Sequence, residues 1–174
     1  MKKNLLIALF AVMMVCFGQH AYAQVSATTT PVTVNINLTD AISITLGADP
    51  TVDFNYLDAE DYTEVQTVTK PNHFTVVSNQ AYNLTVQAVQ DFAPVGPALD
   101  IVNVSVDEES VTNNGGTPED NVPLSTTPAP LLNGAAASAE AIYQINYEIP
   151  DATTLLGLEG SNFSTTVTYT ATQL

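Results

Sequence analysis

Basic residues are nearly absent from this sequence. Its 174 residues include three Lys or Arg against 18 Asp or Glu. Two of the three basic residues are Lys2 and Lys3, and the third is Lys70. Binding to nucleic acid or to an anionic lipid surface needs a patch of positive charge. We therefore expect neither partner for this chain.

Trp is absent, and Cys occurs only once. Cys16 lies in an N-terminal segment that we expect to be removed, which leaves no disulfide to stabilise the fold. His73 is then the last His, with no second His or Cys to complete a zinc site. A Ser-His-Asp triad would need His73, and the chain has no Gly-x-Ser-x-Gly motif. We expect His73 to be structural and predict that the chain is not an enzyme.

Residues 1–23 have the three parts of a secretory signal peptide. A Lys-Lys start is followed by an apolar run shorter than the roughly 20 residues that span a bilayer, and then by Ala-Tyr-Ala. We predict cleavage before Gln24 and export to the cell surface, the extracellular space or the periplasm. The mature chain, residues 24–174, then has one Lys and 18 acidic residues, a net charge of −17, and no membrane span.

Period-two alternation of apolar and polar residues dominates the mature chain. Its clearest examples are two C-terminal stretches, residues 139–149 and 163–170. Alternating aromatic and β-branched residues indicate strands with one buried face. We therefore predict that five side chains of these stretches pack in the core: Tyr143, Ile145, Tyr147, Val167 and Tyr169.

Shorter stretches of the same kind, separated by turn residues, lie at 42–46, 52–54, 62–69, 74–78, 82–88 and 99–106. We expect 74–78 and 82–88 to form a hairpin, and Lys70-Pro71-Asn72 to be a turn. Residues 107–138 are acidic and rich in Pro, Gly and Ala, and we predict that they are mostly a long loop, in which 122–125 or 131–132 pairs briefly along an edge. Eight or nine short strands predict an all-β fold: a single immunoglobulin-like antiparallel β-sandwich within residues 24–174.

An acidic loop at residues 58–64 is the first candidate site. Its carboxylates are those of Asp58, Glu60, Asp61 and Glu64. Calcium ions take oxygen ligands of this kind, which suits an exported protein, although the loop lacks EF-hand spacing. The alternative is a solvated loop that aids solubility. The solvated loop is the favoured interpretation, so the sequence predicts no cofactor, with weak Ca²⁺ binding here as the hypothesis to test.

The N-terminal segment of the mature chain is the second candidate site. Residues 24–31 are rich in Thr and are predicted to be a flexible arm. Behind them Val32, Val34, Ile36 and Leu38 alternate with polar residues and form a candidate strand, residues 32–38. Such a strand either begins its own sandwich or adds to the exposed edge of a neighbouring protein. In the second case, its backbone hydrogen bonds supply affinity and its apolar side chains fill the neighbour's core.

Two segments resemble small secreted bacterial β-sandwich proteins. Residues 74–86, FTVVSNQAYNLTV, look like the central hairpin of fimbrial subunits. Residues 160–170, GSNFSTTVTYT, are similar to the closing strand of WxL-like surface domains, with Tyr169 where those have Trp. The resemblance implies a non-enzymatic surface or fimbrial-type protein whose partners are other subunits or surface proteins, joined by strand addition. The alternative function is an extracellular glycan-binding module, with Ca²⁺ as a helper.

Overall fold

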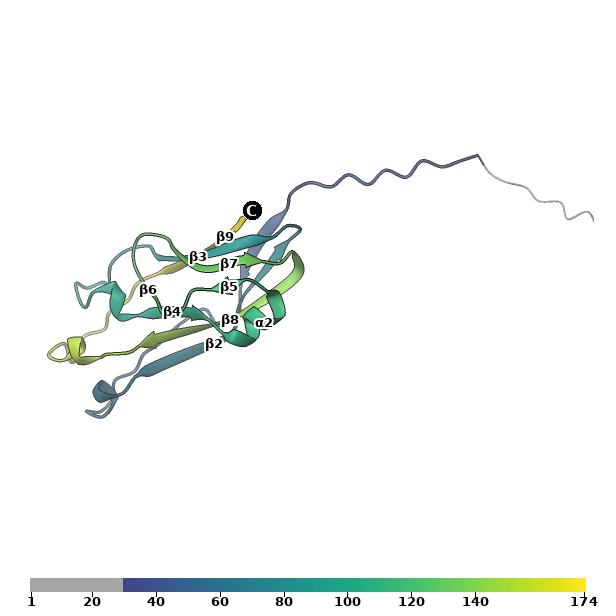
Figure 1. Cartoon of the computed structure of the whole chain (residues 1–174). Helices are drawn as coiled ribbons and strands as arrows, with labels where there is room; N and C mark the ends of the chain where they lie inside the picture. The colour runs from purple at the N-terminus through teal and green to yellow at the C-terminus, as the bar shows by residue number, and fades with distance from the viewer. Residues whose placement is uncertain (1–29) are drawn as a thin grey trace, which may run out of the picture. The chain divides into compact units, whose positions relative to one another are not determined.

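The computed structural model describes residues 30–174. The predicted signal peptide and most of the flexible arm lie outside the described residues. The chain divides into two units, Met1–Asn37 and Leu38–Leu174. In the first unit, residues 30–37 run as an extended trace without helix or strand (Figure 1).

The second unit is an antiparallel β-sandwich, which confirms the predicted fold class (Figure 1). The strands of its first sheet, in spatial order, are β1 (Ile42–Leu46), β2 (Gln66–Ser78), β8 (Ser138–Ile149), β4 (Asn103–Val106) and β6 (Val122–Pro123). Those of the second sheet are β5 (Thr117–Pro118), β7 (Ala129–Ala135), β3 (Tyr82–Ala88) and β9 (Val167–Gln173). The edge strands of the two sheets are therefore β1, β6, β5 and β9.

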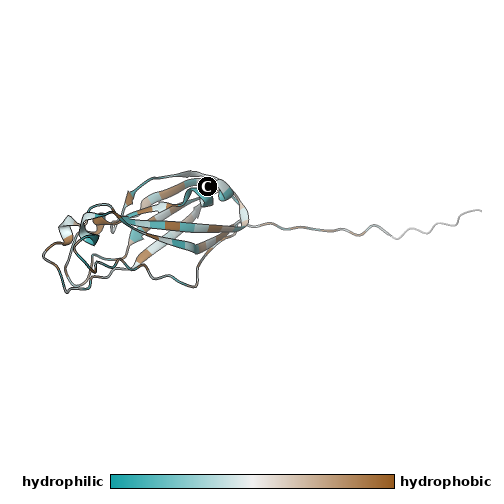
Figure 2. Ribbon diagram, turned by 90° about the horizontal axis from the view of Figure 1, so that it is seen from below, coloured by the Kyte–Doolittle hydropathy of each residue, from teal (hydrophilic) through white to brown (hydrophobic). Residues whose placement is uncertain are grey.

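Alternating side chains of both sheets form the core. The bands of colour along the strands in Figure 2 show the matching alternation of hydropathy. Tyr143, Ile145 and Tyr147 on β8 are buried, as predicted. The hydroxyls of Tyr82 and Tyr143 hydrogen-bond across the two sheets at 2.7 Å. This contact satisfies two polar atoms that would otherwise be costly to bury.

The predicted core residues on β9 are less buried than expected. Val167 and Tyr169 pack against the core but are only partly buried. The regular strand also begins at Val167 rather than at Phe163, and only an isolated bridge from Ser164 to Ala93 precedes it. The wall of the sandwich next to β9 is therefore less covered than the interior strands.

The predicted turn at Lys70-Pro71-Asn72 is wrong, because β2 continues through it as one strand. Lys70 pairs with Ile145 and Phe74 with Tyr143, so three residues of β2 lie opposite one residue of β8. This β-bulge accommodates Pro71, since its unpaired positions need no ladder N–H. The predicted hairpin of 74–78 with 82–88 is also wrong: the two segments belong to β2 and β3, in opposite sheets.

Residues 107–138 contain more regular structure than the predicted long loop, although strands do form at 122–123 and across 131–132 as the alternative had it. They contain the helix α2 (Glu108–Asn114) and the strands β5, β6 and β7. The Asp107 carboxylate caps the helix by accepting the N–H of Glu109 at 3.0 Å, and Gly115, with φ of 73°, ends it. Three short 3-10 helices complete the described elements: η1 (Asp61–Thr63), η2 (Leu99–Ile101) and η3 (Thr153–Leu155). The expected strand at 52–54 is not formed.

Candidate binding groove

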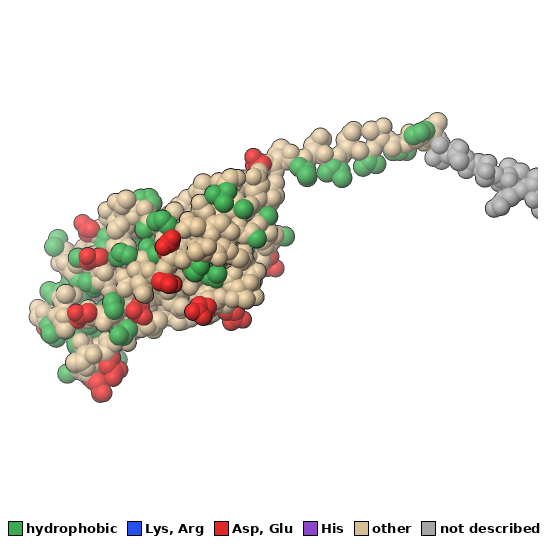
Figure 3. All heavy atoms as spheres, viewed as in Figure 1, with side chains coloured by type: hydrophobic (Ala, Val, Ile, Leu, Met, Phe, Trp, Pro, Cys, Tyr) green, Lys and Arg blue, Asp and Glu red, His purple; other side chains and the backbone are tan. Residues whose placement is uncertain are grey.

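The candidate strand, residues 32–38, is not the first strand of the described sandwich, which begins with β1. No strand is assigned within residues 30–41. Its four apolar side chains are 79–85% exposed, and Figure 3 shows apolar side chains along one side of this segment. Four large apolar side chains on one face of an extended segment are therefore left without a partner in the described residues.

One side of the sandwich is bordered by β1 and β9, edge strands of the two sheets that contact each other. Ile42, Ile44 and Leu46 of β1 pair with the buried Ser78, Val76 and Phe74 of β2. Because directly opposed residues of a sheet share a face, these three side chains point toward the core. They are nevertheless 36–54% exposed, whereas Val76 and Phe74 are fully buried.

The same pattern holds on β9, across the opening. Its alternate residues pair with the four buried inward residues of β3, Tyr82, Leu84, Val86 and Ala88. The β9 residues that share this inward face are only partly buried. Apart from the polar Gln173, the inward faces of β1 and β9 thus form a partly exposed apolar seam. We call this seam, together with the cleft that continues it, the open edge.

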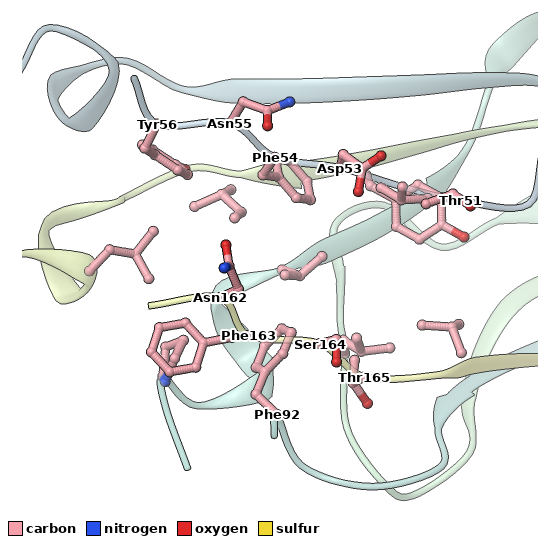
Figure 4. Close-up of a pocket in the computed structure, with 18 of the residues that line it drawn as sticks. Thr51, Asp53, Phe54, Asn55, Tyr56, Phe92, Asn162, Phe163, Ser164 and Thr165 are labelled. Atoms are coloured by element: carbon pink, nitrogen blue, oxygen red, sulfur yellow. The ribbon is translucent and has the colours of Figure 1, made fainter. Parts of the chain in front are cut away.

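The cleft lies beyond the ends of β1 and β9 and has a volume of about 940 Å³. One wall is the extended segment of residues 50–57, and the other is residues 159–166. Figure 4 shows Phe54 and Tyr56 directed from the first wall toward Asn162 and Phe163 of the second. The floor is formed by side chains of several elements, among them Val102, Leu124, Tyr147, Ile149 and Leu155.

A chain of three polar rings lies where the cleft meets the seam. His73 Nε2 is 2.9 Å from the Tyr147 hydroxyl, which in turn hydrogen-bonds the Tyr169 hydroxyl. The His73 ring packs edge-on against both Tyr rings, at centroid distances of 5.7 and 5.5 Å. His73 is 3% exposed, and its Nδ1 has no hydrogen-bond partner within the described residues. The prediction that His73 is structural agrees with this packing.

Burial controls the protonation of this group. It lowers the pKa of His73, an effect that the positive charge of Lys70 reinforces and the carboxylate of Asp49 opposes. Burial also raises the pKa of Tyr147 to about 12, and that of Tyr169 well above its ordinary value. At neutral pH the three rings are therefore uncharged, as an apolar groove requires.

Close backbone contacts fix the β1 wall next to these rings. Gly47 donates its N–H to the His73 carbonyl at 2.8 Å. A Cβ on Gly47 would lie 2.2 Å from the Asn72 carbonyl oxygen, so only glycine fits there. Lys70 Nζ binds the Asp49 carboxylate at 2.5 Å, and this contact lowers the pKa of Asp49. The chain thus packs against the bulge in β2 where it passes from β1 into residues 50–57, the first wall of the cleft.

The acidic loop lies next to the cleft, and two of its carboxylates bind the loop's own backbone. Asp61 accepts the N–H groups of Leu57 and Asp58, at 2.6 and 3.1 Å. Asp58 accepts those of Glu60 and Asp61, at 3.0 and 3.3 Å. Within residues 30–174, no three His, Cys, Asp or Glu side chains are grouped as metal ligands would be. Calcium binding by Asp58, Glu60, Asp61 and Glu64 stays a prediction.

The cleft was missed at the level of sequence, although a signal for one wall existed. Val52, Phe54 and Tyr56 continue the alternation of β1, and they become a wall rather than a strand because no neighbouring strand pairs with them. The opposite wall, residues 159–166, was expected to belong partly to the last strand. Which edge of a sandwich stays uncovered depends on contacts far apart in sequence, so local patterns do not reveal it.

Among the described residues, no helix has the length and apolar character needed to cross a membrane. No protein-family model and no curated protein matches this chain. Evidence for function therefore comes from the geometry of the open edge and of the candidate strand.

Proposed function

We propose that this chain is an exported, non-enzymatic structural subunit of the surface or fimbrial type that assembles by strand addition. The candidate strand of one copy fills the open edge of another copy. The observation that carries the proposal is a match of two unsatisfied surfaces. The seam between β1 and β9 leaves inward apolar side chains partly exposed, and residues 32–38 present four exposed apolar side chains on one face.

The energetics favour a strand rather than a loosely bound apolar segment. Fully burying a Val, Leu or Ile side chain contributes about 1.5–3 kcal/mol, so four contribute about 6–12 kcal/mol. Association costs about 4–15 kcal/mol in lost freedom of motion. The side chains alone therefore do not secure binding. Backbone hydrogen bonds to the free edges of β1 and β9, at about 0.5–1.5 kcal/mol each, supply the difference.

The root of the candidate strand and the cleft lie at opposite ends of the sandwich, which favours open chains of subunits. The candidate strand joins the sandwich through residues 39–41, next to Asn79 and Gln173. The cleft lies beyond Leu46 and Val167, the other ends of β1 and β9. A contact between two different surfaces of one protein is heterologous, and it propagates unless rotation closes a ring. Head-to-tail filaments are the expected product.

The candidate strand and the sandwich also differ in charge. All 18 acidic residues of the chain lie at or beyond Asp40, whereas residues 24–38 carry no charge. On the face in Figure 3, acidic side chains are spread over the second unit and no Lys or Arg is visible. A neutral strand approaches this acidic surface without electrostatic repulsion, although two complete subunits repel each other.

Peptide binding tests the proposal. A fluorescent peptide of residues 30–38 is titrated with the chain lacking residues 24–38, and anisotropy reports binding. The core contains no residue of the deleted segment, so the shortened chain should fold. A matched peptide in which apolar and polar residues exchange places has the same composition and the opposite faces. Saturable binding of the native peptide alone supports strand addition, and equal or absent binding of both peptides refutes it.

An extracellular glycan is the second candidate ligand, because aromatic rings border the cleft. The Tyr56 and Tyr62 rings lie 5.0 Å apart at its rim, and Phe54 and Phe163 face the cleft from its two walls (Figure 4). Aromatic faces of this kind stack on sugar rings. Displacement of the bound peptide by surface oligosaccharides would support this function, and peptide binding unchanged by them would exclude the cleft as a glycan site.

A further inference from the structure

The backbone at the root of the candidate strand, residues 39–41, is fastened to the sandwich by two side chains. The Asn79 side-chain amide donates to the Thr39 carbonyl at 2.7 Å and accepts the Ala41 N–H at 3.0 Å. Asn79 N–H also donates to the Ala41 carbonyl at 3.2 Å. Gln173 Nε2, from the end of β9, donates to the same carbonyl at 3.0 Å. Residues 39–41 therefore continue in line with β1, past the turn between β2 and β3.

A subunit that used its own candidate strand would have to reverse the chain within this root. The simplest reversal is a two-residue loop, Thr39-Asp40, which pairs Leu38 with Ala41, Ile36 with Ser43 and Val34 with Thr45. Opposed residues of an antiparallel pair share a face. Ser43 and Thr45 alternate with the inward residues of β1 and point outward. A two-residue loop thus turns every apolar side chain of the strand away from the core.

A three-residue loop, residues 39–41, would restore the correct face by pairing Leu38 with Ile42. Loops of this length normally end in a residue with left-handed backbone, which is usually glycine. That position is Ala41, and the loop contains neither Gly nor Asn. Ala41 would also have to give up its N–H and carbonyl contacts with Asn79 and Gln173. A longer loop that also keeps the apolar side chains facing the core would break the same contacts, and it would take apolar residues out of the paired strands.

We propose that Asn79 and Gln173 are positioning residues that direct the candidate strand to a second copy of the chain. By holding residues 39–41 in line with β1, they oppose closure of a subunit on itself. This inference rests on strand addition as the proposed function. It adds that the candidate strand inserts into a second copy rather than into its own subunit. The partner of the open edge is then another copy of this protein.

Two kinds of variant of the chain from Gln24 test the inference. The first, Asn79→Ala with Gln173→Ala, removes the side-chain bonds to the root backbone; the Asn79 N–H bond to Ala41 and the hydrogen bond from Gln80 Nε2 to the Asp40 carboxylate stay. The second, Asp40→Asn with Ala41→Gly, keeps both side chains and supplies the residues that a three-residue turn prefers. Gln87→Ala, on β3, is the matched control. Mass is measured by size-exclusion chromatography with light scattering, and burial of residues 32–38 is measured by hydrogen exchange at a concentration where monomers dominate.

We expect both double variants to lose most of their multimers and to give monomers whose residues 32–38 exchange slowly, while the control behaves like the parent protein. Multimers retained by both variants would overturn the inference, as would monomers in which residues 32–38 exchange freely. Binding of the 30–38 peptide to each variant lacking residues 24–38 shows that its open edge is intact. If the parent protein neither forms multimers nor binds the peptide, the proposed function itself fails, which is a separate result.

Discussion

Truncating one apolar side chain of the candidate strand should weaken assembly, and truncating its polar neighbour should not. Ile36 is at the centre of the apolar face and Asn35 points to the opposite side of the extended segment. If Ile36 is buried in the open edge of a second copy, Ile36→Ala removes a buried aliphatic group at a cost of about 2–5 kcal/mol. Because about 1.4 kcal/mol is a factor of ten in affinity, the loss is about 30-fold to several thousand-fold.

Sedimentation velocity over a range of concentrations measures this loss, with Asn35→Ala as the matched control. The Ile36 side chain is 80% exposed in the described chain, so Ile36→Ala should leave the melting temperature of dilute monomer unchanged. The stability of the subunit and the strength of assembly are thereby separated. Equal weakening by Ile36→Ala and Asn35→Ala would show that the segment does not bind through one face, and no weakening by either would remove it from the interface.

Four further predictions concern the subunit and its charge. Tyr147→Ala should lower the free energy of unfolding, measured by chemical denaturation, by about 3–5 kcal/mol. Tyr147→Phe should lower it by about 1–3 kcal/mol, because His73 Nε2 loses its hydrogen-bond partner. A loss under about 1 kcal/mol for Tyr147→Ala would contradict the assignment of Tyr147 to the core. The pKa of His73 is lowered in the fold, so on acidification the unfolded chain binds a proton at this ring before the folded chain does. The contribution of His73 to the free energy of unfolding should therefore be complete above pH 6.5 and fall as the pH drops from there toward the lowered pKa. His73→Gln should flatten the stability profile in that window, and an unchanged slope would assign it to other groups. Raising NaCl from about 20 to about 200 mM should strengthen self-assembly by screening acidic subunits but leave binding of the neutral 30–38 peptide unchanged; weaker assembly in salt would oppose the charge argument. Millimolar CaCl₂ should raise the melting temperature relative to chelator, and Asp58→Asn with Asp61→Asn should abolish the difference; identical curves for the parent protein would leave the acidic loop as a solvated loop.

Local alternation was enough to predict the interior of the sandwich. On β8, the buried faces of Tyr143, Ile145 and Tyr147 follow directly from period-two spacing, because both neighbours of this strand lie within the chain. The same spacing on β9 predicted the inward direction of Val167 and Tyr169 but not their partial exposure. Exposure depends on whether a further strand covers the edge, and a strand's own sequence does not contain that information.

Turn and helix chemistry was harder to interpret from the sequence. Pro71 and Asn72 are typical of turns, and Asn72 does adopt a positive φ of 50°, yet the segment is a bulge because β8 pairs on both sides of it. Helix α2 has only seven residues, too few for a helical period to be recognised, although its Asp107 cap and Gly115 end are visible in the sequence. The open edge required knowledge of both sheets, so only its candidate ligand, residues 32–38, was identified beforehand.

Strand addition between copies is tested most directly by comparing the chain from Gln24 with the same chain lacking residues 24–38, using size-exclusion chromatography with light scattering over a wide concentration range. The deletion removes the four exposed apolar side chains and leaves the sandwich core complete. We predict concentration-dependent multimers for the longer chain and folded monomers at every concentration for the shorter one. Monomers for both chains, or multimers for both, would contradict assembly through the candidate strand.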